Sequence, residues 1–170
     1  CCPVSVELGA DISSCMGETV MLDAGNSGVS FKWFRDGVEV ATSKLLTVST
    51  SGLYEVEVTD ISGCAKKDKV RVTFNELPVI NMMTTAQFCE GETYSITPMI
   101  TGGQSYKWFK DNAEISGQTS NKLNITQAGT YKLEVTSSAG CKNTSTTIAT
   151  SIKAPVVELG NSLQKCEGET

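Results

Sequence analysis

The chain has 170 residues, of which 39% are hydrophobic and 19% are charged, and its formal net charge is −5. This composition is typical of a folded protein, and the length is sufficient for two small domains. The acidic balance argues against nucleic-acid binding, and no apolar run approaches the roughly 18 residues of a membrane-spanning helix, so we expect neither partner. Histidine is absent, which excludes Ser-His-Asp and Cys-His catalysis and His-ligated metals. We therefore expect no enzymatic activity, no catalytic residue, no metal and no cofactor.

A repeat organises the chain. The segment 15–19, Cys-Met-Gly-Glu-Thr, returns at 89–93 and again at 166–170, at steps of 74 and 77 residues. Further landmarks return in the same order, namely Lys-Trp-Phe at 32–34 and 107–109, Gly-x-Tyr at 52–54 and 129–131, and Gly-Cys at 63–64 and 140–141. Repeats of this kind indicate stacked structural units. We predict one unit over 1–77, a second over 78–154 and the start of a third over 155–170, and we interpret the chain as a piece of a longer protein.

Within each unit, hydrophobic and polar residues alternate with a period of two, which is typical of half-buried strands. In chain order, this alternation predicts strands around 19–22, 31–33, 54–58 and 131–135. Asp36-Gly37 and the cluster 60–63 read as turns. No stretch of ten or more residues has helical spacing. About seven short strands in each unit predict an all-β fold, with two small antiparallel β-sandwiches in tandem.

The landmarks fit an immunoglobulin-like layout. Trp33 sits where the third strand of such a domain carries its core Trp, and the segment 51–54 resembles a tyrosine corner. The core residues that we predict are Trp33, Tyr54 and Val56 in the first unit and Trp108, Tyr131 and Leu133 in the second. The cysteines of an antibody domain would fall at Ala24 and Val56, and at Pro98 and Leu133 in the second unit. The usual inter-sheet disulfide is therefore missing.

The combination of these motifs resembles the Ig-like and PKD-like repeats of very large surface proteins of Bacteroidetes, including gliding-motility adhesins of the SprB type. The shared motifs are the Cys-x-Gly-Glu-Thr opening, the central Trp, the Ser-Gly-x-Tyr-x-Val-x-Val-Thr segment and the Gly-Cys close. They cover essentially the whole chain. The resemblance implies export through the type 9 secretion pathway, an extracellular location on the bacterial cell surface and a role in cell adhesion.

Seven cysteines in a chain without His are thiols, metal ligands or disulfides. No Cys-x-x-Cys pair suggests a zinc site. Two cysteines at fixed places in each unit, in predicted turns rather than in the core, favour disulfides and an oxidising compartment.

The pairing of these cysteines follows from the Ig-like layout. Cys15 precedes the second strand and Cys64 follows the sixth, so they lie at opposite ends of one unit, on the order of 25 Å apart, whereas a disulfide needs Cα atoms within about 7 Å. The first unit leads into the second through Leu77-Pro78, which brings Cys15 close to Cys141. We prefer the inter-repeat pair Cys15–Cys141. The alternative is Cys15–Cys64 with Cys89–Cys141.

The remaining cysteines follow the same rule. Cys64 pairs with a preceding repeat, or with Cys1 or Cys2, whereas Cys89 and Cys166 pair with later repeats.

Two functions remain open on the sequence. The first is a structural repeat array that forms the stalk of a large adhesin, with neighbouring repeats of the same polypeptide, and surface glycans or the motility machinery, as partners. The alternative is an accessory Ig-like module that binds glycan or protein within a secreted multidomain enzyme. Only 6% of residues are aromatic, and most recur at core positions, which favours the first.

Overall fold

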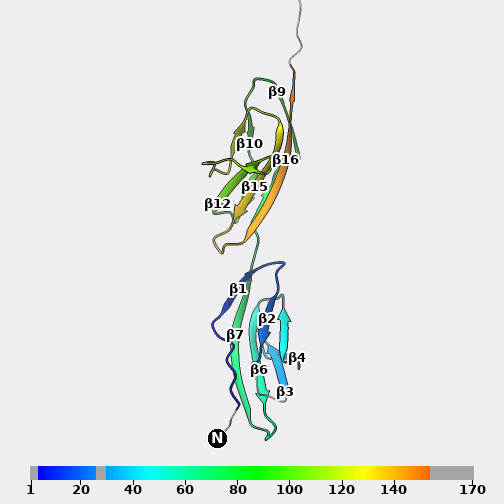
Figure 1. Cartoon of the computed structure of the whole chain (residues 1–170), viewed down its shortest axis with the longest axis vertical. Coiled ribbons are helices and arrows are strands. Elements are labelled where there is room, and N and C mark those ends of the chain that lie inside the picture. Colours follow the sequence, from blue (N-terminus) through cyan, green and yellow to red (C-terminus); the bar gives the residue numbers. More distant parts are fainter. Residues whose placement is uncertain (1–3, 26–29, 154–170) are drawn as a thin grey trace, which may run out of the picture.

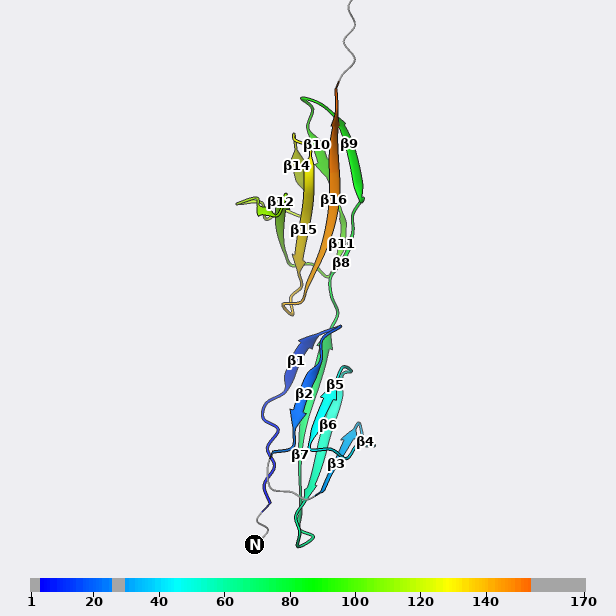
Figure 2. The same cartoon turned by 45° about the vertical axis from the view of Figure 1, so that its right-hand side comes forward.

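The computed structural model of the chain describes residues 4–25 and 30–153. Two elongated β-sandwiches lie end to end along one long axis (Figures 1 and 2). The sheets of the first sandwich end at Asn75 and those of the second begin at Val79. The predicted third unit, 155–170, lies outside the described residues, as do Cys1, Cys2 and Cys166.

The first sandwich is built from two sheets. Its strands are β1 (Ile12–Cys15), β2 (Val20–Asp23), β3 (Ser30–Arg35), β4 (Val38–Ala41), β5 (Leu45–Val48), β6 (Gly52–Thr59) and β7 (Ala65–Asn75). One sheet has the order β1-β7-β6-β3-β4, and the other pairs β2 with β5. The side chains that alternate along β6 explain this arrangement, because Tyr54, Val56 and Val58 are buried between the sheets while Glu55 and Glu57 are not.

The second sandwich has the same arrangement, but it is divided into more strands, several of which have only two or three residues. Its strands are β8 (Val79–Asn81), β9 (Thr85–Cys89), β10 (Tyr94–Ile96), β11 (Met99–Thr101), β12 (Ser105–Lys110), β13 (Ala113–Glu114), β14 (Leu123–Ile125), β15 (Gly129–Thr136) and β16 (Lys142–Ile152). The main sheet has the order β13-β12-β15-β16-β9, and β10 pairs with β14 and β11 with β8. The expectation of wholly antiparallel sheets was wrong, because β1 and β9 each join the edge of the main sheet in parallel with the last strand of their unit.

Each unit has its own hydrophobic core around one tryptophan. Trp33 and Trp108 are both 0% exposed, and each indole N–H donates to a backbone carbonyl 2.9 Å away, that of Ser43 or Ser120. A buried indole needs such a partner because an unpaired N–H is costly away from water. Both tryptophans therefore lie where the sequence predicts them.

Apolar packing takes the place of the missing inter-sheet disulfide. Ala24 and Val56 are both 0% exposed in the first core, and Leu133 is 0% exposed in the second. Pro98, the fourth position in question, is only partly buried.

The two tyrosine corners have the same geometry. The Tyr54 hydroxyl donates to the carbonyl of Thr50 at 2.8 Å, and the Tyr131 hydroxyl donates to that of Gln127 at 2.8 Å. Burial, and then the nearby carboxylate of Asp111, raise the pKa of Tyr131. Each corner thus fixes the turn that enters the central strand of its main sheet, β6 or β15.

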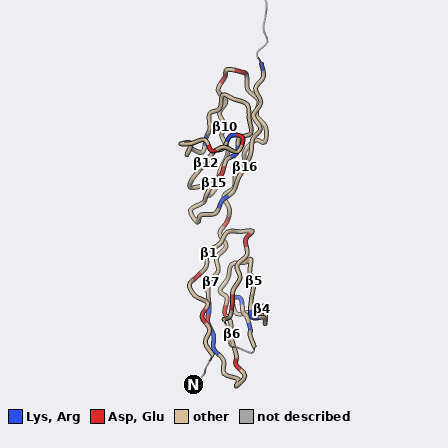
Figure 3. The backbone as a smooth tube through the Cα atoms, viewed as in Figure 1, with Lys and Arg blue, Asp and Glu red and all other residues tan. Residues whose placement is uncertain are grey.

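Charges of both signs are interspersed along the two units (Figure 3). Lys67 forms ion pairs with Glu55 at 3.0 Å and Glu57 at 3.3 Å, and the pKa of Lys67 is raised, chiefly by its hydrogen bond with Glu55. Lys67 also lies 5.3 Å from the centre of the Phe34 ring, and Lys132 lies 4.5 Å from that of Phe109. The Phe that follows each core Trp is thus covered on the outer face by a cation.

Candidate functional site: the junction between the two units

The junction is positioned by two strands that run side by side in the same direction. β1 pairs in parallel with the end of β7, and their last register pair joins Cys15 to Asn75. Both strands therefore end side by side, at the point where the chain leaves β7 and continues into the second unit. This pairing carries Cys15 to the boundary between the sandwiches.

The Cys-x-Gly-Glu motif forms a tight turn after Cys15. Gly17 has a φ of 90°, a conformation that side-chain-bearing residues rarely adopt. The turn brings Glu18 back so that its N–H donates to the carbonyl of Cys15 at 3.1 Å, while its carboxylate accepts from the N–H of Cys15 at 3.0 Å and from the hydroxyl of Ser14. The hydroxyl of Ser14, followed by the N–H of Cys15, holds the pKa of Glu18 below its ordinary value. The motif thus fixes the backbone that presents the Cys15 sulfur.

The turn between β15 and β16 presents the second cysteine. Ser137 and Cys141 close this turn with a backbone bond of 2.8 Å, and the Ser137 hydroxyl accepts from the N–H of Cys141 at 3.1 Å. Gly140 has a φ of 84°. Cys141 is only 1% exposed, so the expectation that the turn cysteines lie outside the packed interior was wrong for this residue. Two residues of the first unit contact it, namely Cys15 through the disulfide and Asn75 through its carbonyl oxygen.

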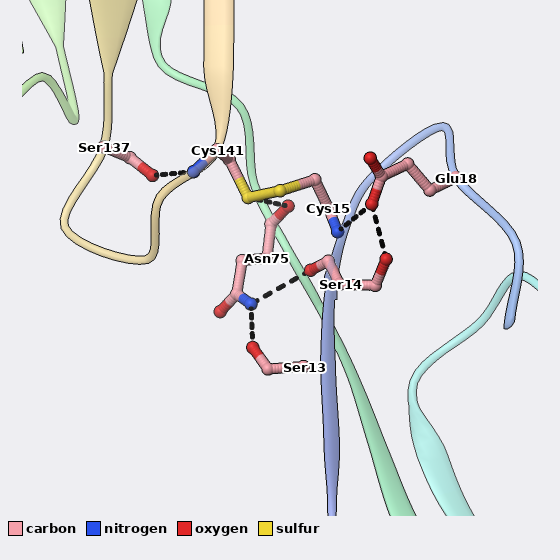
Figure 4. The surroundings of a disulfide bond; sticks show 7 residues. All are labelled: Ser13, Ser14, Cys15, Glu18, Asn75, Ser137 and Cys141. Carbon is pink, nitrogen blue, oxygen red and sulfur yellow. Dashed lines mark hydrogen bonds between the residues drawn. A yellow bond between two sulfur atoms is a disulfide. The ribbon is translucent and has the colours of Figure 1, made fainter.

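A disulfide joins Cys15 to Cys141 across the junction (Figure 4). Their Cα atoms are 5.6 Å apart and the sequence separation is 126 residues. This is the pairing preferred on the sequence. The alternative pairing was wrong, because Cys15 is not bonded to Cys64 and Cys89 is a free, exposed cysteine. The reason is the one anticipated, since the turn after β6 and the end of β1 lie at opposite ends of the first unit (Figure 2).

Polar contacts around the disulfide hold the linker on both sides. The Asn75 side chain donates to the Ser13 hydroxyl at 2.8 Å and to the Ser14 carbonyl at 3.0 Å, which ties β7 to β1. In the second unit, the Asn143 side chain donates to the carbonyl of Pro78 at 2.9 Å, and Pro78 is fully buried. The backbone connection is therefore anchored to the first residues of β16 as well as to the end of β1.

The Cys141 sulfur lies 3.9 Å from the Asn75 carbonyl oxygen. Because a disulfide sulfur carries no hydrogen, this is a packing contact, and it brings the disulfide directly against the backbone that leads into the linker. Ser137, Glu18, Asn75 and Asn143 were not singled out on the sequence as junction residues. Only Glu18 carried a signal, as part of the repeated motif, because Asn75 and Asn143 contact residues more than 60 positions away in the sequence.

The other cysteines have different environments. Cys64 is disulfide-bonded, and its expected partners Cys1 and Cys2 lie outside the described residues. Cys89 ends β9 as Cys15 ends β1, with the same turn after it. Cys166 lies outside the described residues.

Over residues 4–25 and 30–153, no three His, Cys, Asp or Glu side chains are grouped so that they could hold a metal ion. A search of the same residues found no helix with the length and apolar character needed to span a membrane.

Comparisons with known proteins bear on the fold. No protein-family model matches the chain, and no curated protein matches its sequence. The solved structures that it resembles include hemolin, an insect immune protein described as having a domain arrangement with implications for homophilic adhesion. Hemolin is similar over 88% of this chain at 16% identity with a TM-score of 0.52, and this chain spans 47% of the hemolin chain.

Two further structures are more distant. A chimeric titin tandem matches 86% of this chain and 96% of its own length at 21% identity, with a TM-score of 0.41. Immunoglobulin domains 1–5 of Sidekick-1 match over 84% of this chain and 37% of theirs at 16% identity, with a TM-score of 0.44. Together with the strand order, the hemolin likeness shows the fold: the chain is all-β and consists of immunoglobulin-like β-sandwiches in tandem.

Proposed function

We propose that the chain is a segment of a structural repeat array, which forms the stalk of a large bacterial cell-surface adhesin of the gliding-motility type. The observation that carries this proposal is the Cys15–Cys141 disulfide. A flexible string of domains needs one peptide linker at each boundary. A second covalent connection beside that linker restricts bending, which suits a protein that must project from a surface.

The partners in this proposal are neighbouring repeats of the same polypeptide. Cys89 occupies the place that Cys15 has in the first unit, with Gly91 at a φ of 88° and the N–H of Glu92 donating to the carbonyl of Cys89 at 3.0 Å. The N–H of Glu90 donates to the carbonyl of Ile152 at 2.9 Å, as the N–H of Met16 does to that of Asn75. The turn after Cys89, at the end of the second unit that lies away from the first, thus has the same backbone hydrogen bonds as the turn after Cys15 at the junction.

We propose that Cys89 bonds to the Gly-Cys turn of a following repeat, and Cys166 to that of the repeat after it. Each bond forms when two thiols give two electrons and two protons to the disulfide of a thiol oxidoreductase. Disulfides of this kind persist in oxidising compartments, which supports export and an extracellular location. The adhesive contact with surface glycans or the motility machinery belongs to other parts of the polypeptide.

Surface display tests the proposal directly. Antibodies against this chain should label intact cells of the source organism, and deletion of the gene should reduce movement of those cells over a surface. Labelling that appears only after the cells are opened would contradict the location, and unchanged movement would contradict the link to motility.

The disulfide array has its own test. A protein extended by the following repeat should protect Cys89 from a maleimide reagent, whereas Cys89 in the 170-residue chain should react. Reaction of Cys89 in both proteins would contradict the array of inter-repeat disulfides.

One feature favours the second function, an accessory binding module of a secreted enzyme. The second unit has an open hollow of about 480 Å³, lined by Met83, Thr85, Ala86, Gln87, Tyr94, Ile148 and Thr150. Met83 is 68% and Ile148 53% exposed, whereas the first repeat has Gly9 and Arg71 at the corresponding places. A glycan array probed with the wild-type chain and with the variant Met83→Asp/Ile148→Asp separates the two functions. Glycan binding that this variant loses supports the module, and absence of binding supports the stalk.

A further inference from the structure

The disulfide encloses almost all of both sandwiches. A separation of 126 residues between Cys15 and Cys141 places 125 residues inside the closed loop, from Met16 to Gly140. Both core tryptophans and every strand from β2 to β15 belong to this loop. Of the described strands, only β1 and β16 lie outside it.

The two excluded strands lie on opposite sides of the junction along the long axis (Figures 1 and 2). β1 runs toward the junction and ends at Cys15, and β16 begins just after Cys141 and runs away from the junction. A continuous covalent line therefore passes from β1 through the disulfide into β16. The peptide linker, which continues β7, crosses the same boundary beside it.

We propose that this line gives the chain a mechanical function, in which tension along the polypeptide bypasses the 125 residues enclosed by the disulfide. Tension that enters at the N-terminal end passes through β1, the disulfide and β16, because this is the shortest covalent path. The 125 enclosed residues are not part of this path, so they do not have to bear tension. Unfolding of the enclosed residues of either unit therefore cannot increase the distance between the two ends of the chain. The setting of this function, a stalk under pull, rests on the function proposed above.

The hydrogen bonding of β16 supports this role. β15 pairs with β16 from Lys142 to Ala149, and β9 pairs with it from Ile148 to Ile152. Every residue of the strand is thus paired on at least one side. Because the hydrogen bonds join β16 to its neighbours sideways, tension along the strand loads many of them together rather than one after another.

The Cys15–Cys141 bond determines the extension that the chain can reach. Without it, 125 enclosed residues would add roughly 400–450 Å of contour length at full extension, before the folded length is subtracted. With the bond intact, these residues contribute nothing.

Single-molecule pulling between the two ends, through peptide handles, tests the proposal. Two proteins are compared that differ only at this bond. In both, serine replaces the other cysteines, which are Cys1, Cys2, Cys64, Cys89 and Cys166. The second protein also carries Cys15→Ser and Cys141→Ser. We expect unfolding steps that together add the enclosed contour length in the second protein and none of that length in the first.

The same steps in both proteins would overturn the proposal. If the serine background fails to fold, the wild-type chain is pulled with and without dithiothreitol, and equal extension in the two conditions would overturn it in the same way. The outcome is measured on the isolated chain, so it is independent of where the protein is displayed. Failure of surface labelling would remove the proposed setting and leave this mechanical result intact.

Discussion

The two units have the same core and differ in how their cysteine-bearing ends are used. In both, the last strand along the chain has 11 residues, β7 or β16, and pairs antiparallel with the central strand of the main sheet and in parallel with the strand that carries the first cysteine, β1 or β9. Cys15 is bonded to the neighbouring unit, whereas Cys89, in the same kind of turn, is a free and exposed cysteine. The comparison teaches that the local motif builds the same cysteine-presenting turn whether or not its cysteine is bonded.

The largest effect is expected from the cysteines themselves. Cys15→Ser with Cys141→Ser should lower the free energy of unfolding by about 4–5 kcal/mol, because the unfolded chain gains the entropy of a loop that closes over 125 residues. Cys89→Ser is the matched control and should change it little. Urea unfolding followed by circular dichroism measures both. An equal loss in the two variants would end the comparison between the two motifs.

Substitution of the core tryptophans tests whether the two units are equally stabilised by their cores. Trp33→Ala and Trp108→Ala each remove a fully buried side chain, and each should cost about 3–5 kcal/mol in its own unit through the cavity left behind. Urea unfolding followed by circular dichroism measures the cost in the altered unit, and the tryptophan that remains reports on the other unit by fluorescence. Costs that differ widely would show that the two cores are not equivalent.

A smaller and matched effect is expected at the tyrosine corners. Tyr54→Phe and Tyr131→Phe each delete one hydroxyl that donates to a backbone carbonyl at 2.8 Å. Each should cost about 0.5–1.5 kcal/mol, the usual net contribution of one hydrogen bond. Thermal unfolding of the two variants side by side measures it, and a stable Tyr54→Phe with an unfolded Tyr131→Phe would contradict the equivalence.

The smallest effect is a difference in pH dependence between the two Gly-Cys turns, residues 60–64 and 137–141. In the first unit, Asp60 accepts from the hydroxyl and the N–H of Ser62 and from the N–H of Cys64. The Ser62 hydroxyl, followed by the N–H of Cys64, holds the pKa of Asp60 below its ordinary value. Ser137 has the same place in the second unit and does not titrate.

The sign of the pH effect follows from that lowered pKa. The contribution of Asp60 to stability is present above the pKa of the unfolded chain, near pH 4, and is lost as the pH falls through the lower folded value. Trp33 fluorescence should therefore show the first unit weakening as the pH falls below about 4. The variant Asp60→Ser, which copies the second unit, should lose this part of the pH dependence. An unchanged acid transition in the variant would contradict the role given to Asp60.

Much of this arrangement follows from local patterns. The alternation along β6 and β15 predicts their strands and the burial of Tyr54 and Leu133. The pairing of Cys15 with Cys141 follows because the length of a strand separates the two ends of one unit. The parallel attachment of β1 and β9 does not follow, because alternation fixes which face a residue occupies and not which strand lies beside it.

The polar contacts of the junction could not be predicted from the sequence either. Asn143 and Pro78 are 65 residues apart, and the Asn75 side chain reaches back to Ser13 over 62. An asparagine in a polar stretch is ordinary by itself, and its role appears only when the fold of each unit brings residues more than 60 positions apart side by side.

The double connection at the junction also changes what a protease can do to this protein. A single cut anywhere between Met16 and Gly140 opens the polypeptide but leaves its two ends attached through Cys15 and Cys141. A cut beside Leu77, a residue that is 38% exposed between the two units, does not release the second unit. Separation of the two units requires reduction of the disulfide as well. A molecule built in this way keeps its ends together after damage that would divide an ordinary string of domains.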